Sequence, residues 1–264
     1  MMKTLGIIGL GNMGGAIARG LAPAGMFHMF GYDPDEDTRN RQSDIMHILP
    51  TGRDVARQSD MLLLAVKPQI MRSVLTDLEP AIRPETCIIS IAAGITLEKL
   101  VEWAGQRASV VRVMPNTPAM IGRGVYALCL DHALLTNETK ASVMSMFAAI
   151  GKAHALPERL FDAYTGLIGS GPAYIFAFME ALIDAGVTLG LARPQATEMV
   201  QALLSGTVAM AGEAGTHPAL LREMVTSPGG TTIAGLNALD EHRFRFAVNQ
   251  AVAASARRSK ELGG

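Results

Sequence analysis

A glycine-rich segment, Gly9-Leu10-Gly11-Asn12-Met13-Gly14, most constrains the fold of this chain. It ends a run of apolar residues that is typical of a buried strand, and it opens an amphipathic helical pattern over residues 13–21. In a strand–turn–helix unit, the first glycine permits a tight turn, the second lets a pyrophosphate approach the backbone, and the third lets the helix pack on the strand. Free N–H groups at the helix start also favour an anion. The segment therefore predicts a dinucleotide site, whereas the same glycines outside this context would indicate only a turn.

Short apolar runs rich in β-branched residues alternate with amphipathic stretches over the first part of the chain. The predicted strands cover residues 4–9, 29–32, 61–66, 86–91 and 110–114. Strands that alternate with helices imply the α/β class, with a parallel, doubly wound sheet of the Rossmann type. We assign residues 1–157 to this dinucleotide-binding domain.

Beyond Gly151 the β-branched runs disappear, and Ala, Leu, Met and Glu dominate between breaks of Gly and Pro. This pattern predicts an all-α second domain over residues 158–264. The predicted helices cover residues 173–190, 194–213, 218–225, 231–240 and 243–261. The 16 methionines of the chain suit adaptable packing between helices.

Charge and cysteine usage exclude several functional classes. The 23 Lys and Arg residues balance 24 Asp and Glu residues, so no strong field is expected to hold nucleic acid or an anionic membrane. Cys87 and Cys129 lack the spacing of a metal site, which favours reduced thiols and no bound metal. The longest apolar stretch, residues 173–191, contains Glu180 and Asp184 and is typical of a buried or interface helix rather than a membrane span. We therefore expect a cytoplasmic protein with a small-molecule substrate.

An acidic residue at the end of the second predicted strand bears on the choice of cofactor. Asp33 lies about 20 residues after the glycine-rich segment, where a carboxylate accepts a hydrogen bond from the ribose 2′-OH of NAD and repels a 2′-phosphate. Arg39 and Arg41 follow on the next predicted helix and can reach such a phosphate. The residues alone favour NAD and leave NADP open.

Three further segments follow predicted strands and so fall at the carboxyl edge of the sheet, where ligands bind in such folds. Lys67 and Pro68 follow one strand, and the Lys67 ammonium can touch ribose or phosphate. Ala93 and Asn116 follow the next two strands, where a small residue and an amide suit a nicotinamide ring. The alternative for Lys67 is that it is an ordinary lysine at a strand end.

A loop in the helical domain has the composition of an anion site. In Ser227-Pro228-Gly229-Gly230-Thr231-Thr232 one helix stops, a glycine pair turns the chain and a new helix begins. Backbone N–H groups of residues 230–232 and the nearby hydroxyls can hold a carboxylate. The same residue types also suit a helix end followed by a threonine N-cap, so both interpretations stay open.

Five segments together resemble the pyrroline-5-carboxylate reductase family over nearly the whole chain: residues 9–14, 66–68, 114–118, 169–174 and 225–232. The resemblance implies reduction of 1-pyrroline-5-carboxylate to L-proline by NADPH or NADH, the last step of proline biosynthesis. It also implies that the helical domain forms an intertwined homodimer, which in this family often assembles into decamers.

The resemblance also implies a role for individual residues. It places the cofactor on Gly9, Leu10, Gly11, Asn12, Met13, Lys67, Pro68, Ala93 and Asn116. It places the substrate carboxylate on Ser227, Gly229, Gly230 and Thr231, with the Thr232 hydroxyl near the ring nitrogen as the catalytic group. Many NADPH-using members of the family have Ser or Thr where this chain has Asp33.

Two other functions are compatible with a dinucleotide domain. The glycine-rich segment also resembles that of β-hydroxyacid dehydrogenases. That resemblance implies a catalytic lysine on the first long helix of the second domain, but this chain has no lysine between Lys152 and Lys260. A dinucleotide-sensing regulator would keep the fold without the chemistry, because a fold does not prove activity. The loop over residues 227–232 argues against the regulator, since sensing needs no second anion site.

Overall fold

The computed structural model describes residues 2–263, and its contacts divide the chain into two compact units. The first unit runs up to Ser170 and includes the end of the last helix from Ala254, while the second is Gly171–Ala253. This division falls later than residue 157 because the intervening segment packs on the sheet. Phe161 and Tyr164 are buried there, and the Tyr164 hydroxyl donates a hydrogen bond to the Val125 carbonyl at 2.7 Å.

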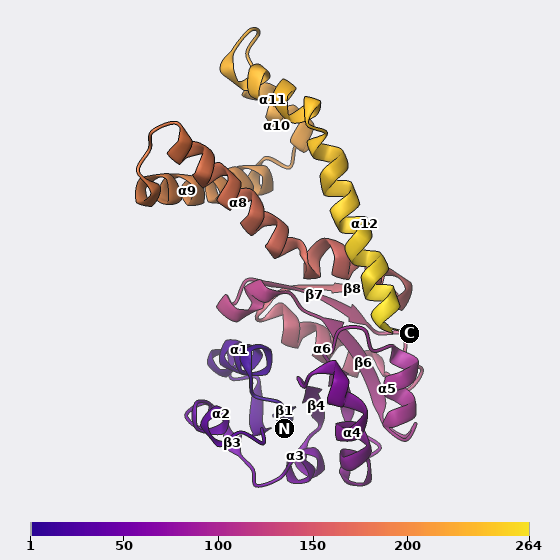
Figure 1. The fold of residues 1–264 in the computed structure, drawn as a ribbon. Helices are drawn as coiled ribbons and strands as arrows, with labels where there is room; N and C mark the ends of the chain where they lie inside the picture. Colours follow the sequence, from indigo (N-terminus) through magenta and orange to yellow (C-terminus); the bar gives the residue numbers. More distant parts are fainter. Residues whose placement is uncertain (1, 264) are drawn as a thin grey trace. The chain divides into compact units, whose positions relative to one another are not determined.

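The first unit contains one sheet, in which the residues described form eight strands in the order β3-β2-β1-β4-β5-β6-β7-β8 (Figure 1). They are β1 (Lys3–Ile8), β2 (Phe27–Tyr32), β3 (His47–Ile48), β4 (Met61–Leu64), β5 (Cys87–Ser90), β6 (Ser109–Met114), β7 (Gly124–Cys129) and β8 (Gly151–Ala155). The five strands predicted from the sequence are confirmed, and β3, β7 and β8 are additions. Every neighbouring pair is parallel except β6 and β7.

The five predicted strands form a parallel sheet, as expected, and the one antiparallel pair involves β7, which was not predicted. Only residues 115–123 connect β6 to β7, and a parallel crossover needs about a dozen residues or more. The chain forms a short 3₁₀ turn there, Thr117–Ile121, and returns antiparallel.

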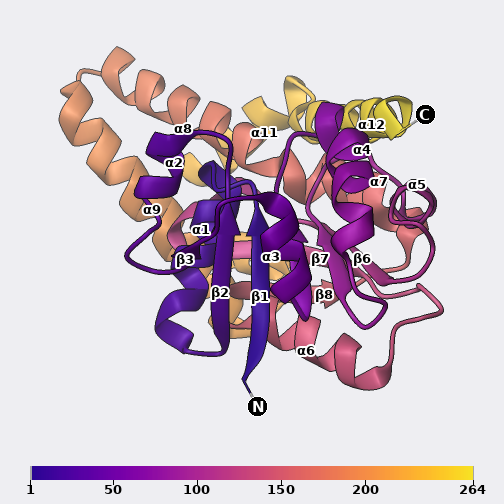
Figure 2. The same ribbon diagram turned by 90° about the horizontal axis from the view of Figure 1, so that it is seen from below.

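Helices cover both faces of the sheet, as the doubly wound class requires. The first unit contains α1 (Asn12–Leu21), α2 (Glu36–Asn40), α3 (Gly52–Gln58), α4 (Pro68–Leu78), α5 (Leu97–Trp103), α6 (Asn137–Ala148) and α7 (Phe161–Tyr164). Alternate strand residues point to opposite faces. Leu63 therefore packs in one core cluster with residues of α1 and α6, while Leu62 packs in another with residues of α3, α4 and α5. Figure 2 shows β1 and β2 side by side, with α3 next to them.

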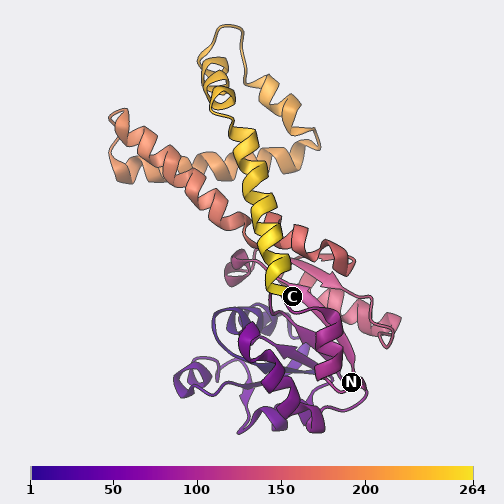
Figure 3. The same cartoon turned by 45° about the vertical axis from the view of Figure 1, so that its right-hand side comes forward.

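The second unit is helical, and all five helices predicted from the sequence are confirmed. They are α8 (Gly171–Thr188), α9 (Arg193–Ala214), α10 (Pro218–Met224), α11 (Thr231–Glu241) and α12 (Phe244–Gly263), the last of which ends in the first unit. Proline in the first turns of α9 and α10 fixes where these helices begin. Helices α8 and α9 lie side by side (Figure 3).

Large apolar side chains of the second unit are exposed. Phe176 is 64% exposed, Val208 72% and Met224 71%. The continuous helical run Glu158–Thr188 has the length and composition of a membrane-crossing helix, and only 6% of its most apolar window is buried. Exposed apolar surface of this kind is typical of a site that contacts another protein or a membrane.

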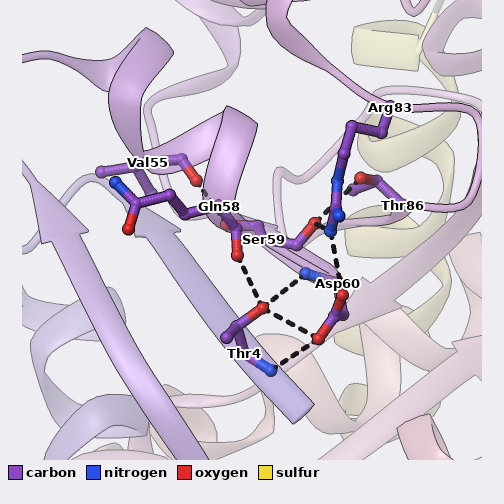
Figure 4. Close-up of polar contacts among 7 residues, drawn as sticks. All are labelled: Thr4, Val55, Gln58, Ser59, Asp60, Arg83 and Thr86. Carbon is purple, nitrogen blue, oxygen red and sulfur yellow. Dashed lines mark hydrogen bonds and ion pairs between the residues drawn. The ribbon is translucent and has the colours of Figure 1, made fainter.

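A polar network joins β1, β4 and the segment before β5 at the amino ends of these strands (Figure 4). The Asp60 Oδ2 atom accepts hydrogen bonds from the Thr4 N–H and hydroxyl, both at 2.9 Å, and Oδ1 accepts one from Arg83 at 2.9 Å. Arg83 and the Thr86 hydroxyl both donate to the Ser59 carbonyl. Partial burial raises the pKa of Asp60, but the hydrogen bonds from Thr4 and Arg83 outweigh it and hold that pKa below its ordinary value.

Candidate active site

The three glycines of the loop between β1 and α1 have three different surroundings. Gly9 has a φ of +91°, and a Cβ there would lie 2.7 Å from the Ala65 carbonyl oxygen. A Cβ on Gly14 would collide with the Gly9 carbonyl. A Cβ on Gly11 would meet nothing within 4 Å. Gly9 and Gly14 are therefore required by the turn and by helix packing, whereas Gly11 faces open space that a ligand can fill.

Backbone donors at the start of α1, next to Gly11, have no side-chain partner. Gly11 is the N-cap of α1 and no side chain caps the helix, so the N–H groups at its first turn are available to an anion. Asn12 and Met13, both predicted cofactor residues, are the first two residues of α1. Leu10 contributes differently, because its side chain is 1% exposed in the core and its N–H donates to Asp33 Oδ2 at 2.8 Å.

A cavity of about 870 Å³ adjoins the loop and has a size typical of ligand sites. Four predicted cofactor residues line it: Gly9, Gly11, Asp33 and Lys67. The wall also contains polar residues that sequence analysis missed, namely Tyr32, Thr51, Arg53, Ser73 and Asp77. The Thr51-Gly52 pair at the start of α3 was the available signal, but the two-residue β3 strand before it gives no periodic pattern.

Six predicted cofactor residues do not line the cavity: Leu10, Asn12 and Met13, described above, and three that follow other strands at the same sheet edge, Pro68, Ala93 and Asn116. Pro68 opens α4 directly after Lys67, and Ala93 is an exposed residue that follows β5. Asn116 follows β6 and is buried, and its Oδ1 accepts a hydrogen bond from the Val125 N–H at 2.9 Å. Asn116 thus holds the start of β7, and its contact with a nicotinamide carboxamide stays a prediction.

Charged groups at the cavity have defined partners. Asp33 Oδ1 accepts the Asp35 N–H at 3.0 Å, in addition to the bond from Leu10. Arg53 pairs with Asp77 at 2.6 Å, and both line the wall. Arg39 donates to the Asp33 carbonyl at 2.7 Å.

The predicted substrate loop lies in the second unit, between α10 and α11. Gly229 has a φ of +67°, and the Gly230 N–H donates to the Ser227 carbonyl at 3.1 Å. The N-cap of α11 is Gly230, with no side-chain cap, so the alternative of a threonine N-cap is wrong. The N–H groups of Thr231 and Thr232 at the first turn of α11 are therefore free of side-chain capping. Within residues 2–263, no hydrogen bond holds the half-buried Thr232 hydroxyl.

Three other side chains with reactive groups are either buried or cap a helix. Burial raises the pKa of both Cys87 and Cys129 to about 11, which leaves them protonated near neutral pH. His217 caps α10 by accepting the Ala219 N–H at its Nδ1. The structure thus places the predicted cofactor residues in the first unit and the predicted substrate residues in the second.

Comparisons with known proteins cover both units. A family model described as pyrroline-5-carboxylate reductase dimerisation matches residues 158–262. A model described as NADP oxidoreductase, coenzyme F420-dependent, matches residues 4–94.

Relatives that match over nearly the full length of the chain are also pyrroline-5-carboxylate reductases. The chain is 39% identical to the pyrroline-5-carboxylate reductase of Arabidopsis thaliana, over 98% of this chain and 95% of the relative. The crystal structure of Plasmodium falciparum pyrroline carboxylate reductase with NADP bound is 34% identical, with a TM-score of 0.89 over 99% of this chain and 98% of that one. The pyrroline-5-carboxylate reductase of Coxiella burnetii is 30% identical, with a TM-score of 0.93 over 100% of both chains.

Proposed function

Since the chain belongs to the pyrroline-5-carboxylate reductase family, we infer that it reduces 1-pyrroline-5-carboxylate to L-proline with NADPH or NADH, the last step of proline biosynthesis. The carrying observation is the similarity to these reductases at 37–40% identity over 98% or more of the chain. The open space at Gly11, beside a cavity of ligand size, fits the dinucleotide that such a reaction needs.

The reaction needs orientation more than a strong acid. Bound nicotinamide dinucleotide supplies the hydride, which adds to the carbon of the C=N bond, and the ring nitrogen gains a proton to give the secondary amine. The imine carbon is most electrophilic when the nitrogen is already protonated. The protein must therefore hold one face of the ring toward the cofactor and exclude competing geometries.

For the substrate, the proposed carboxylate site is Ser227, Gly229, Gly230 and Thr231. The uncapped start of α11 supports this site, because free N–H groups and the positive end of the helix dipole favour an anion. We propose that the Thr232 hydroxyl, one position further along α11, forms a hydrogen bond with the ring nitrogen and positions the proton on it.

For the cofactor, the proposed donors to the pyrophosphate are the N–H groups of Gly11, Asn12 and Met13. Their place at the uncapped start of α1 supports this role. Lys67 lines the cavity and suits ribose or phosphate, and Pro68, Ala93 and Asn116 extend the proposed site along the carboxyl edge of the sheet.

The dimerisation region indicates that the chain forms an oligomer. We propose a homodimer as its unit and a homodecamer as a larger assembly. Exposed apolar side chains on α8, α9 and α10 support pairing of helical units, because a second copy would bury them. We also propose a cytoplasmic location, which the two buried free thiols suit.

A substrate panel tests the function against the β-hydroxyacid dehydrogenase alternative. The purified protein is supplied with each reduced cofactor and pyrroline-5-carboxylate, and separately with each oxidised cofactor and 3-hydroxy acids. We expect the absorbance of the reduced cofactor to fall with the imine and to stay unchanged with the hydroxy acids. Turnover of a hydroxy acid without turnover of the imine would reverse the assignment, and cofactor binding without either reaction would favour the sensing role.

A further inference from the structure

The carboxylate of Asp33 is fixed at the cavity wall. Its Oδ2 accepts the Leu10 N–H at 2.8 Å and its Oδ1 accepts the Asp35 N–H at 3.0 Å. Both donors are backbone groups, and Leu10 is anchored by its core side chain. The carboxylate therefore cannot turn away from the cavity without breaking two hydrogen bonds. Each oxygen keeps a second lone pair that can accept from a hydroxyl group.

The arginines that could offset this charge have other partners. Arg39 donates to the backbone carbonyls of Asp33 and Pro34, at 2.7 and 3.0 Å. Arg41 donates to the Thr38 hydroxyl at 2.7 Å.

Arg53 lines the same cavity as Asp33, but its guanidinium group already forms an ion pair with Asp77. Its two bonds to that residue are 2.6 Å to the carboxylate and 3.0 Å to the carbonyl. The charges of this pair cancel at the wall. Among residues 2–263, no ion pair neutralises Asp33.

We propose that Asp33 selects the cofactor of this chain, so that NADH binds more tightly than NADPH; this inference rests on the proposed function. A ribose 2′-OH donates a hydrogen bond to the fixed carboxylate, whereas a 2′-phosphate meets a like charge that cannot move away. The same carboxylate also positions the glycine loop through Leu10. Asp33 thus has two roles: it distinguishes NADH from NADPH, and it holds the glycine loop through the Leu10 N–H.

Equilibrium binding without substrate tests both roles. NADH and NADPH are titrated into the purified protein, and binding is followed by nicotinamide fluorescence. For the unmodified chain we expect NADH to bind about tenfold more tightly or better. Asp33→Asn keeps an oxygen for the Leu10 N–H and removes the charge, so the ratio of the two affinities should shift toward NADPH by about tenfold. Asp33→Ala removes the anchor as well and should weaken the binding of both cofactors.

Asp37→Asn is the matched control, because it makes the same change of charge at an exposed residue of α2 outside the cavity wall. It should leave the ratio unchanged. The inference is overturned if the unmodified chain binds NADPH more tightly, and equally if Asp33→Asn leaves the ratio of the two affinities unchanged. A selective loss of NADPH affinity in Arg39→Gln or Arg53→Gln would also overturn it, by assigning the phosphate to that arginine. These results leave the proposed function intact, whereas binding of neither cofactor would refute both.

Discussion

At the scale of single residues, the glycine loop shows which positions a sequence can predict. Gly9 and Gly14 are constrained by collisions that any strand–turn–helix unit of this kind would have, so their spacing alone predicts the motif. The roles of Leu10 and Asn116 depend on hydrogen bonds to residues 23 and 9 positions away, respectively. No local pattern contains those partners, and only the folded chain reveals them.

Thr232 provides a test of the substrate site at this scale. Thr232→Ala should lower kcat with pyrroline-5-carboxylate by about tenfold or more, because it removes a hydrogen bond to the reacting ring. Dinucleotide affinity should not change, since the cofactor residues belong to the other unit. Steady-state kinetics and cofactor titration measure the two quantities separately.

Thr226→Ala is the control for that variant. Thr226 precedes the same loop, and its hydroxyl is satisfied by the Arg222 carbonyl at 2.6 Å. It should affect turnover much less than Thr232→Ala. Equal turnover in the Thr232 variant and the unmodified chain would remove the proposed catalytic role.

At the scale of elements, the three strands that sequence analysis missed differ in their physical character. β3 has two residues, too few for any periodicity, and β8 (Gly151–Ala155) is mostly exposed or half-buried and lacks an apolar run. β7 is apolar but follows a short connection, and its antiparallel direction is fixed by the length of that connection. The helices of the second unit were predictable because Gly and Pro mark their ends.

The hydrogen bonds of Asp60 allow a prediction about the free energy of unfolding and its dependence on pH. Asp60→Asn should lower the free energy of unfolding by about 1 kcal/mol at neutral pH, because it removes the charge-assisted bond from Arg83. The pKa of Asp60 is lowered in the folded state, so its contribution is present above the unfolded pKa and is lost as pH falls through the folded value. The difference between the two proteins should therefore shrink below about pH 4.

Denaturant unfolding at fixed protein concentration measures this difference. Glu261→Gln is the control, because its pair with Arg258 is exposed and should contribute no more than about 0.5 kcal/mol. A difference at Asp60 that stays constant across this pH range would show that the carboxylate charge has no part in it.

At the scale of the whole molecule, the two units differ in what the sequence could specify. The first unit buries its own core on both faces of the sheet. The hydrophobic periodicity of its strands and helices therefore sufficed to predict its fold class. The second exposes large apolar side chains along its helices, and their burial depends on a partner that a single sequence does not display. Its boundary was also hard to place, since residues 158–170 are helical yet pack with the first unit.

A charge on the exposed apolar face tests the oligomer. Val208→Asp on α9 should weaken subunit association by about 2 kcal/mol or more, because association would bury an unpaired carboxylate. Light scattering or sedimentation should then report a smaller mass. Leu134→Asp, on an exposed apolar residue of the first unit, should leave the mass unchanged. If the unmodified chain and both variants had the same mass, the interface would not include Val208.

The most direct test of the account is identification of the product. Purified protein is incubated with pyrroline-5-carboxylate and each reduced cofactor, and proline is quantified by chiral chromatography against the cofactor consumed. We expect one L-proline for each cofactor oxidised, with a faster reaction from NADH at low cofactor concentration. Cofactor oxidation without proline, or no reaction although both ligands bind, would contradict it.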